Sequence, residues 1–240
     1  MGEHTLLVIN ANTSVSMTKD IGEAAKRAAS KGTEIITVAS KRGPRIIQGP
    51  VDSALSVPGM LEVAKEYEGR YNGIVSACFG DPGIEPLRSA FGVPAVGIRE
   101  SAFHVASFTG NRFAVITPVK GSEQRLKAIA RLKGIDNKMH SVLYAGVSIP
   151  DLESGSAGAE EYVYAAGKEA VEKGADTLIF GCAGMGWVVD KIASRFDVPC
   201  IDPVQAAVKT LEGILYFCQG KKFHGIPFQN DLLGYPDLLS

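Results

Sequence analysis

Short apolar runs alternate along this chain with longer stretches in which apolar residues recur every three or four positions. The short runs predict buried strands, and the longer stretches predict helices with one apolar face. The expected strands cover residues 5–11, 34–40, 73–79, 93–98, 112–118, 139–146, 176–182 and 198–203. The expected helices cover 16–32, 58–71, a stretch after 98, 121–134, 157–174 and 204–219, and a long loop rich in Gly and Pro covers 41–57. This alternation predicts an α/β fold in which parallel sheets are flanked by helices.

The second half of the chain echoes the first. "CFGDPG" at 78–83 resembles "CAGMG" at 182–186, and "FGVPAVGIRESA" at 91–102 resembles "FDVPCIDPVQAA" at 196–207, at offsets of 104 and 105 positions. Such repetition predicts two related α/β lobes. We expect residues 1–98 plus 206–240 to form one lobe and residues 99–205 the other, with pseudo-twofold symmetry and the active site in the cleft between them.

Each predicted lobe has a cysteine at the carboxyl end of a buried strand, where open α/β sheets bind their ligands. These are Cys78 and Cys182. Two equivalent thiols on opposite sides of one pocket suit a racemisation, in which a proton leaves one face of a carbon and another arrives at the opposite face. Cys200 and Cys218 are expected to be packing residues. The chain lacks the closely spaced Cys and His residues that are typical of zinc sites, so a metal site is not expected.

Composition narrows the classes of function further. The 240 residues carry 25 Lys and Arg against 26 Asp and Glu, a net charge of −1, which does not favour nucleic acid or an anionic membrane as a partner. No apolar run approaches the length of a membrane span, and the N-terminus lacks the basic residues of a signal peptide. We therefore expect a soluble, cytoplasmic protein.

The motifs "INANTS", "CFGDPG", "GIRESAFH", "VITP" and "GCAGM", which lie between about residues 5 and 215, closely resemble those of hydantoin and allantoin racemases in the aspartate/glutamate racemase superfamily. The resemblance implies two pseudo-symmetric Rossmann-like lobes, no cofactor, and Cys78 and Cys182 as the base/acid pair. It also implies that Asn10 and Thr117 line the substrate pocket and that the protein is a homo-oligomer. Ala11 departs from the Pro that relatives commonly have. The tail at 228–240 matches no recognised motif, and the sequence does not specify its role; assembly is one option.

A hydantoin ring carries its C5 proton beside a carbonyl, so loss of this proton gives an enolate. We expect the backbone amides of Phe79, Gly80, Ala183 and Gly184 to stabilise the negative charge on ring oxygens. We also expect backbone amides or a following helix N-terminus to lower the thiol pKa values. Asp81 either contacts the substrate or serves only the Asp-Pro-Gly turn.

Several alternatives remain open at this stage. The two cysteines could be buried small residues without a catalytic role. The chain could be a racemase of aspartate or glutamate, or a two-lobed protein that binds a small metabolite without catalysis. A malonate decarboxylase is less favoured, since such relatives typically keep one catalytic cysteine. The substituent at C5 is not specified by the sequence.

Overall fold

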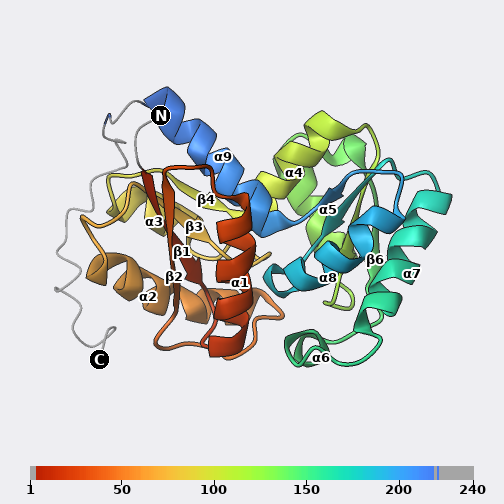
Figure 1. Ribbon diagram of the computed structural model, residues 1–240, viewed down its shortest axis with the longest axis horizontal. Helices are drawn as coiled ribbons and strands as arrows, with labels where there is room; N and C mark the ends of the chain where they lie inside the picture. Colours follow the sequence, from red (N-terminus) through yellow and green to blue (C-terminus); the bar gives the residue numbers. More distant parts are fainter. Residues whose placement is uncertain (1–3, 219–220, 222–240) are drawn as a thin grey trace. The chain divides into compact units, whose positions relative to one another are not determined.

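The computed structural model describes residues 4–218 and 221, and these divide into two compact units (Figure 1). The first unit contains the described residues of Met1–Ile98 and Ala207–Ser240, and the second is Arg99–Ala206. The tail at 228–240 lies outside the described residues.

The first unit is built on a four-stranded parallel sheet with the strand order β2-β1-β3-β4. Its strands are β1 (His4–Asn10), β2 (Thr33–Ala39), β3 (Gly73–Ser76) and β4 (Ala95–Gly97). The helices between them are α1 (Val15–Ala28), α2 (Pro50–Glu66) and α3 (Ile84–Ala90).

The second unit repeats this topology with the order β6-β5-β7-β8, again parallel throughout. Its strands are β5 (Phe113–Thr117), β6 (Met139–Tyr144), β7 (Thr177–Phe180) and β8 (Cys200–Ile201). Its helices are α5 (Glu123–Leu132), α6 (Ile149–Glu153), α7 (Ala159–Glu172) and α8 (Gly186–Ile192), with short 3-10 turns at Asp136–Lys138, Ala183–Met185 and Ala193–Arg195. The predicted pair of similar lobes, each a parallel sheet flanked by helices, is confirmed.

The last helix of each repeat packs in the opposite unit. Helix α4 (Ile98–Thr109) follows β4 but belongs almost entirely to the second unit, where the ring of Phe103 packs at a tilt against that of Phe113 of β5, with centroids 5.5 Å apart. Helix α9 (Pro203–Cys218) follows β8 and lies from Ala207 onward with the first unit (blue in Figure 1), where Glu212 accepts a 2.8 Å hydrogen bond from the Ser30 N–H. The exchange therefore links the two units through the chain twice.

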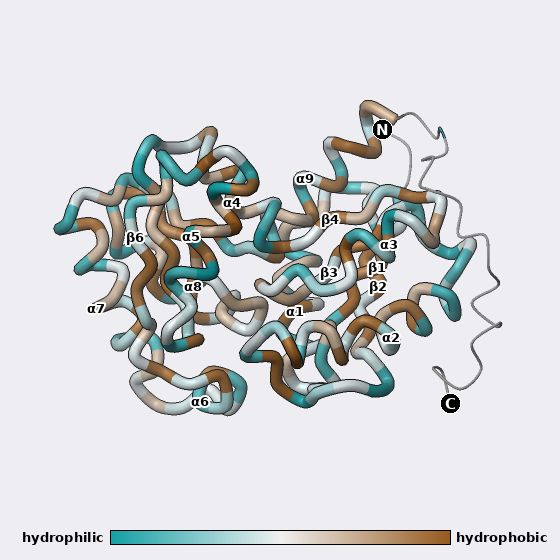
Figure 2. The backbone as a smooth tube through the Cα atoms, turned by 180° about the vertical axis from the view of Figure 1, so that it is seen from behind, coloured by the Kyte–Doolittle hydropathy of each residue, from teal (hydrophilic) through white to brown (hydrophobic). Residues whose placement is uncertain are grey.

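The strands form the core of each unit. Leu6, Leu7, Val8 and Ile9 of β1 are fully buried, as are Phe113 and Val115 of β5. Figure 2 shows hydrophobic colour along the strands and alternating colours along the outer helices. A parallel sheet that is covered on both faces needs continuous apolar runs, which explains why the sequence shows runs and not alternation here.

Helix α2 begins earlier than the sequence predicted. It covers Pro50–Glu66, so the expected loop at 41–57 ends at residue 49 and the expected helix at 58–71 is misplaced. The Asp52 carboxylate accepts hydrogen bonds from the N–H groups of Gln48 (2.9 Å) and Gly49 (3.2 Å), while Pro50 occupies the first turn, where its missing N–H costs nothing. Pro58 lies inside the helix.

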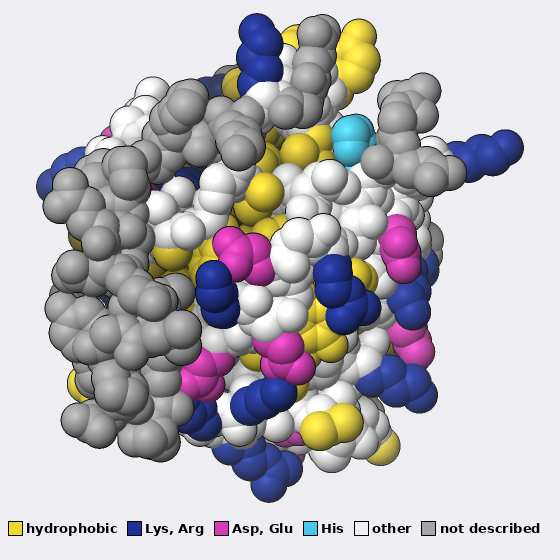
Figure 3. All heavy atoms as spheres, turned by 90° about the vertical axis from the view of Figure 1, so that its left-hand side faces the viewer, with side chains coloured by type: hydrophobic (Ala, Val, Ile, Leu, Met, Phe, Trp, Pro, Cys, Tyr) yellow, Lys and Arg dark blue, Asp and Glu magenta, His cyan; other side chains and the backbone are white. Residues whose placement is uncertain are grey.

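The surface agrees with the balanced charge of the chain. On the face shown in Figure 3, basic and acidic side chains are interspersed. Within the described part of the chain, no helix has both the length and the apolar character needed to cross a membrane.

The packing of α9 on the first sheet gives a testable prediction. A Cβ at Gly73 in β3 would lie 2.9–3.1 Å from the side chain of Leu211, which is fully buried. Gly73→Ala should therefore lower the free energy of unfolding by about 1–3 kcal/mol, and Leu211→Ala by about 2–5 kcal/mol. In urea unfolding the double variant should lose clearly less than the two single losses combined, because the second change removes the clash created by the first.

Gly213, also on α9, is the matched control. A Cβ there meets no atom of the described residues within 4 Å, so Gly213→Ala should stabilise the helix slightly. Additive losses in the double variant would contradict the described contact between Gly73 and Leu211.

Candidate active site

The two cysteines occupy equivalent positions at the carboxyl ends of the two sheets. In the first unit the Ala77 N–H donates to the Ile9 carbonyl (2.9 Å), and in the second the Gly181 N–H donates to the Ile116 carbonyl (2.7 Å). Each bond is a last contact between two neighbouring strands, and each cysteine is the next residue. Cys78 and Cys182 therefore occupy equivalent positions, each directly after the end of the corresponding strand in its unit, β3 or β7.

Asn10 and Thr117 are equivalent in the same way. Asn10 ends β1 and its carbonyl accepts from the Ser40 N–H (2.9 Å), whereas Thr117 ends β5 and its carbonyl accepts from the Ala145 N–H (2.8 Å). Both side chains are therefore at the edge of the sheet that also carries the cysteine.

A tight turn with a strained backbone follows Cys78. The Asp81 N–H donates to the Cys78 carbonyl (2.9 Å), and Asp81 has φ +48°, a conformation that Asp tolerates better than most residues. The Asp81 carboxyl group lies against the backbone of Gly97, where a Cβ would come within 2.2 Å of Asp81 Cγ. The turn is therefore held at both ends, and Gly97 is required because its missing side chain leaves room for this carboxyl group.

Cys182 lies in a different local structure. It precedes the 3-10 turn Ala183–Met185, and its carbonyl accepts from the Met185 N–H (3.1 Å). The side chain packs against the core of the second unit. Burial raises the pKa of the Cys182 thiol to about 11, and a hydrogen bond from the Gly184 N–H opposes this rise only in part.

The expected lowering of the pKa is therefore wrong for Cys182. Desolvation penalises the thiolate more than the Gly184 amide stabilises it. Neither cysteine directly precedes an α-helix, since α3 begins at Ile84 and α8 at Gly186, and each of these helices has only seven residues. Cys182 is thus held as a protonated thiol at neutral pH.

The Asn10 side chain is fully buried and organises its own loop. Its amide donates to Asn12 Oδ1 (2.8 Å) and Thr18 Oγ1 (2.9 Å), and its Oδ1 accepts from the Asn12 N–H (3.3 Å). Ser14 caps α1, since its Oγ accepts from the Met17 N–H. These bonds give Asn10 a structural role, and its role as a substrate contact stays a prediction.

The other predicted site residues lie close to the cysteines along the chain. Thr117 is buried, and its Oγ accepts from the Val119 N–H (3.2 Å). Phe79, Ala183 and Gly184 are buried, whereas Gly80 and Asp81 are half-buried. The Gly184 N–H also acts on the Cys182 sulfur, where it lowers the thiol pKa. The substrate contacts of these residues stay predictions.

Sequence reasoning missed Ser53. This residue lies on α2, in the part of the chain that was expected to be a loop. Its Oγ is 3.0 Å from the position that a Cβ on Gly80 would take, beside the Cys78 turn. The signal that locates it is the Gly-Pro-x-Asp sequence at 49–52, which is typical of a helix start.

The remaining two cysteines do not follow the carboxyl end of a strand: Cys200 begins β8, and Cys218 ends α9. Burial raises the pKa of the Cys200 thiol to about 11, and its Sγ contacts the Val198 carbonyl at 3.6 Å. Among the described residues, no group of three or more His, Cys, Asp or Glu side chains is arranged to hold a metal ion.

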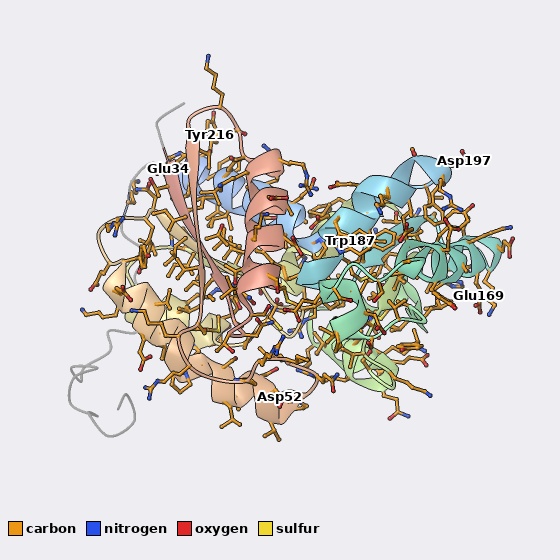
Figure 4. All side chains as sticks on the ribbon, turned by 60° about the horizontal axis from the view of Figure 1, so that its bottom comes forward. Glu34, Asp52, Glu169, Trp187, Asp197 and Tyr216 are labelled. Atoms are coloured by element: carbon orange, nitrogen blue, oxygen red, sulfur yellow. The ribbon has the colours of Figure 1, made fainter. Side chains whose placement is uncertain are left out.

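Among the residues that Figure 4 labels, Asp52 lies at the beginning of α2 in the first unit, and Trp187 lies on α8, the helix that follows Cys182 in the second. The Trp187 indole N–H donates to the Leu152 carbonyl (3.2 Å), and Lys191 Nζ lies 4.8 Å from the centre of the ring. Trp187 is therefore fixed by contacts within the second unit, three residues after Gly184.

Comparisons with known proteins agree with this fold. The sequence profile of the Asp/Glu/Hydantoin racemase family matches residues 6–211. The chain is 36% identical over 210 residues to a hydantoin racemase of Pseudomonas sp. (strain NS671), covering 87% of this chain and 84% of the relative. It is 32% identical over 213 residues to the hydantoin racemase of Paenarthrobacter aurescens, covering 88% and 90%.

Among solved structures, allantoin racemase from Klebsiella pneumoniae superposes with a TM-score of 0.91 at 30% identity, over 98% of both chains. Glutamate racemase from Francisella tularensis shares the fold alone, with a TM-score of 0.66 at 15% identity over 100% of this chain and 95% of the other. The relatives indicate that the protein is an isomerase of the racemase class. The chain belongs to the Asp/Glu/Hydantoin racemase family.

The environment of Cys182 predicts its titration. Alkylation of Cys182 by iodoacetamide, followed as a function of pH by peptide mapping, should rise with a midpoint near pH 11. Because the folded state holds this proton more tightly than the unfolded chain, Cys182 should stabilise the fold fully below about pH 9, and this contribution should be lost as the pH rises towards 11. A midpoint at or below pH 9 would contradict the dominance of burial over the Gly184 hydrogen bond.

Proposed function

We propose that the protein racemises 5-substituted hydantoins without a cofactor, and that Cys78 and Cys182 are the two acid/base groups. Allantoin, which is a hydantoin with a ureido substituent at C5, is included among the substrates. The observation that carries the proposal is the equivalent position of the two thiols, each one residue beyond a matching strand–strand hydrogen bond. The named activities of the relatives supply the substrate class.

The chemistry asks for a base and an acid on opposite faces of C5. Removal of the C5 proton moves the electron pair of the C–H bond into the adjacent carbonyl and gives an enolate. Return of a proton to the other face of C5 restores the carbonyl and inverts the centre. A thiolate and a thiol perform these two steps, and general acid–base catalysis of this kind is worth about 100- to 10,000-fold in rate.

The environment of Cys182 suggests how the roles begin, and Cys78 takes the remaining role. Cys182 keeps its proton because burial raises its pKa to about 11, so it starts as the acid. Cys78 then starts as the thiolate that accepts the C5 proton. After one turnover Cys78 is a thiol and Cys182 a thiolate, which is the state needed to convert the opposite enantiomer. The Gly184 N–H stabilises the Cys182 thiolate in that second state.

The enolate oxygen requires donors that are already in place. We propose that the amides of Phe79, Gly80 and Ala183 supply them, because these residues adjoin the two sulfurs along the backbone. Backbone amides are fixed by the turns that follow each cysteine, so they need little reorganisation as the charge develops. Asn10 and Thr117, at the ends of the neighbouring strands, are proposed to line the same substrate site, and the Asp81 carboxyl group to stand near it.

Replacement of either thiol tests the two-base assignment. Cys78→Ala and Cys182→Ala should each lower racemisation, measured by polarimetry with single-enantiomer 5-benzylhydantoin, by at least about 100-fold. Each variant keeps one acid/base group, so it should still exchange the C5 hydrogen of one enantiomer with D2O. Cys218→Ser, in α9, should retain the wild-type rate. Nearly full racemisation in either alanine variant would defeat the assignment.

The substrate class is tested separately. Purified protein should racemise enantiopure allantoin and 5-benzylhydantoin and leave L-aspartate and L-glutamate unchanged, because a hydantoin C5 proton is more acidic than the α-proton of a free amino acid. Polarimetry of the four substrates side by side gives the comparison. Racemisation of only the free amino acids would instead assign the chain to the aspartate/glutamate branch.

A further inference from the structure

Helix α2 brings a hydroxyl group to the Cys78 turn. The Oγ of Ser53 lies 3.0 Å from the position that a Cβ on Gly80 would occupy, and the Cys78 Sγ lies 3.7 Å from the same position. The oxygen and the sulfur thus border one point in space. Gly80 keeps that point empty, because any larger residue would press its Cβ against the hydroxyl.

The Ser53 hydroxyl has no hydrogen-bond partner among the described residues, although its oxygen is shielded from solvent. A buried hydroxyl without a partner destabilises a folded protein, so its retention needs an explanation. The neighbouring Ser56 shows the contrast, since its Oγ donates to the Ser53 carbonyl at 2.8 Å. The Ser53 side chain is therefore unpaired beside a sulfur that changes its charge in the proposed reaction.

We propose that Ser53 is a positioning residue whose hydroxyl donates a hydrogen bond to the Cys78 sulfur when that sulfur is a thiolate. A thiol is a weak acceptor, whereas an ionised acceptor forms a stronger bond. Rotation about the Ser53 side-chain bond turns the hydroxyl toward or away from the sulfur without moving α2. The inference rests on the proposed role of Cys78 as a base.

Charged groups on the elements around the Cys78 turn are engaged elsewhere. Asp52 of α2 accepts from two backbone N–H groups, and Arg88 of α3 bonds the Ala95 carbonyl (2.9 Å). Asp81, in the turn itself, lies against Gly97 and is the carboxylate nearest to Cys78 in sequence. The same Arg88 also forms an ion pair with Glu85, and Arg42 forms one with Glu62 of α2. A hydrogen bond from the Ser53 hydroxyl would stabilise the thiolate against the negative charge of Asp81, which lies three residues away along the chain.

The test measures the ionisation of Cys78 directly, in the full-length protein. The rate of alkylation by iodoacetamide is followed against pH, and Cys78 is read by peptide mapping so that the other cysteines stay in place. Ser53→Ala should raise the midpoint for Cys78 by about 1 to 2 pH units, the shift expected for loss of one hydrogen bond to a charged group. Its melting temperature should not fall, because an unpaired buried hydroxyl is removed.

Ser53→Thr and Ser53→Val form a matched pair of the same shape, with and without the hydroxyl. The valine variant should show the raised midpoint and the threonine variant the wild-type one. Ser56→Ala, one turn along α2, and Ser141→Ala, which removes an unpaired hydroxyl from β6 of the second unit, should leave Cys78 unchanged.

An unchanged Cys78 midpoint in Ser53→Ala and Ser53→Val would overturn the inference, even if racemisation slowed, because the hydroxyl would then act on something other than the thiolate. Equal shifts in the threonine and valine variants would overturn it too, since shape alone would be responsible. The proposed function fails by a different result, namely nearly full racemisation by Cys78→Ala, and that result is independent of the Cys78 midpoints measured in the Ser53 variants.

Discussion

Parallel strand pairing is the constraint on which the structure depends. In a parallel sheet all carboxyl ends lie at one edge, so the residues that follow the central strands share that edge. The bonds from Ala77 to Ile9 and from Gly181 to Ile116 mark where each strand ends. A slip of one residue would turn each cysteine to the other face of its sheet. The register, fixed by fully buried strands such as β1, therefore determines where the thiols are.

Burial has a chemical consequence as well as a structural one. The packing that stabilises the second unit also desolvates Cys182 and raises its pKa to about 11. The first unit has the same topology but a different turn, with Asp81 at φ +48° and its carboxyl group against Gly97. Two copies of one fold thus provide two different settings for the same side chain. In the proposed mechanism, the high pKa of Cys182 assigns it the starting role of acid and leaves the role of base to Cys78.

The sequence predicted the two α/β lobes and the matched cysteines because both depend on local signals, namely apolar runs, glycine turns and their repetition at a fixed offset. It misplaced α2, since Pro50 and Pro58 read equally well as loop residues or as helix residues. Ser53 was missed for that reason. The pKa direction of Cys182 was wrong because burial is a property of tertiary packing, whereas the nearby amides are visible in the sequence. The hydrogen bonds of Asn10 within its loop could not be predicted either, since a capping loop and a ligand contact use the same residue types.

The stereochemical course of exchange in D2O tests the central claim most directly. The wild-type protein is incubated with one enantiomer of a 5-substituted hydantoin, and C5 deuterium is measured in both enantiomers at low conversion. Two sulfurs with opposed roles predict that the product enantiomer carries deuterium while the recovered substrate remains protiated. Deuterium in the recovered substrate at the rate of product formation, or protium retained in the product, would contradict the account.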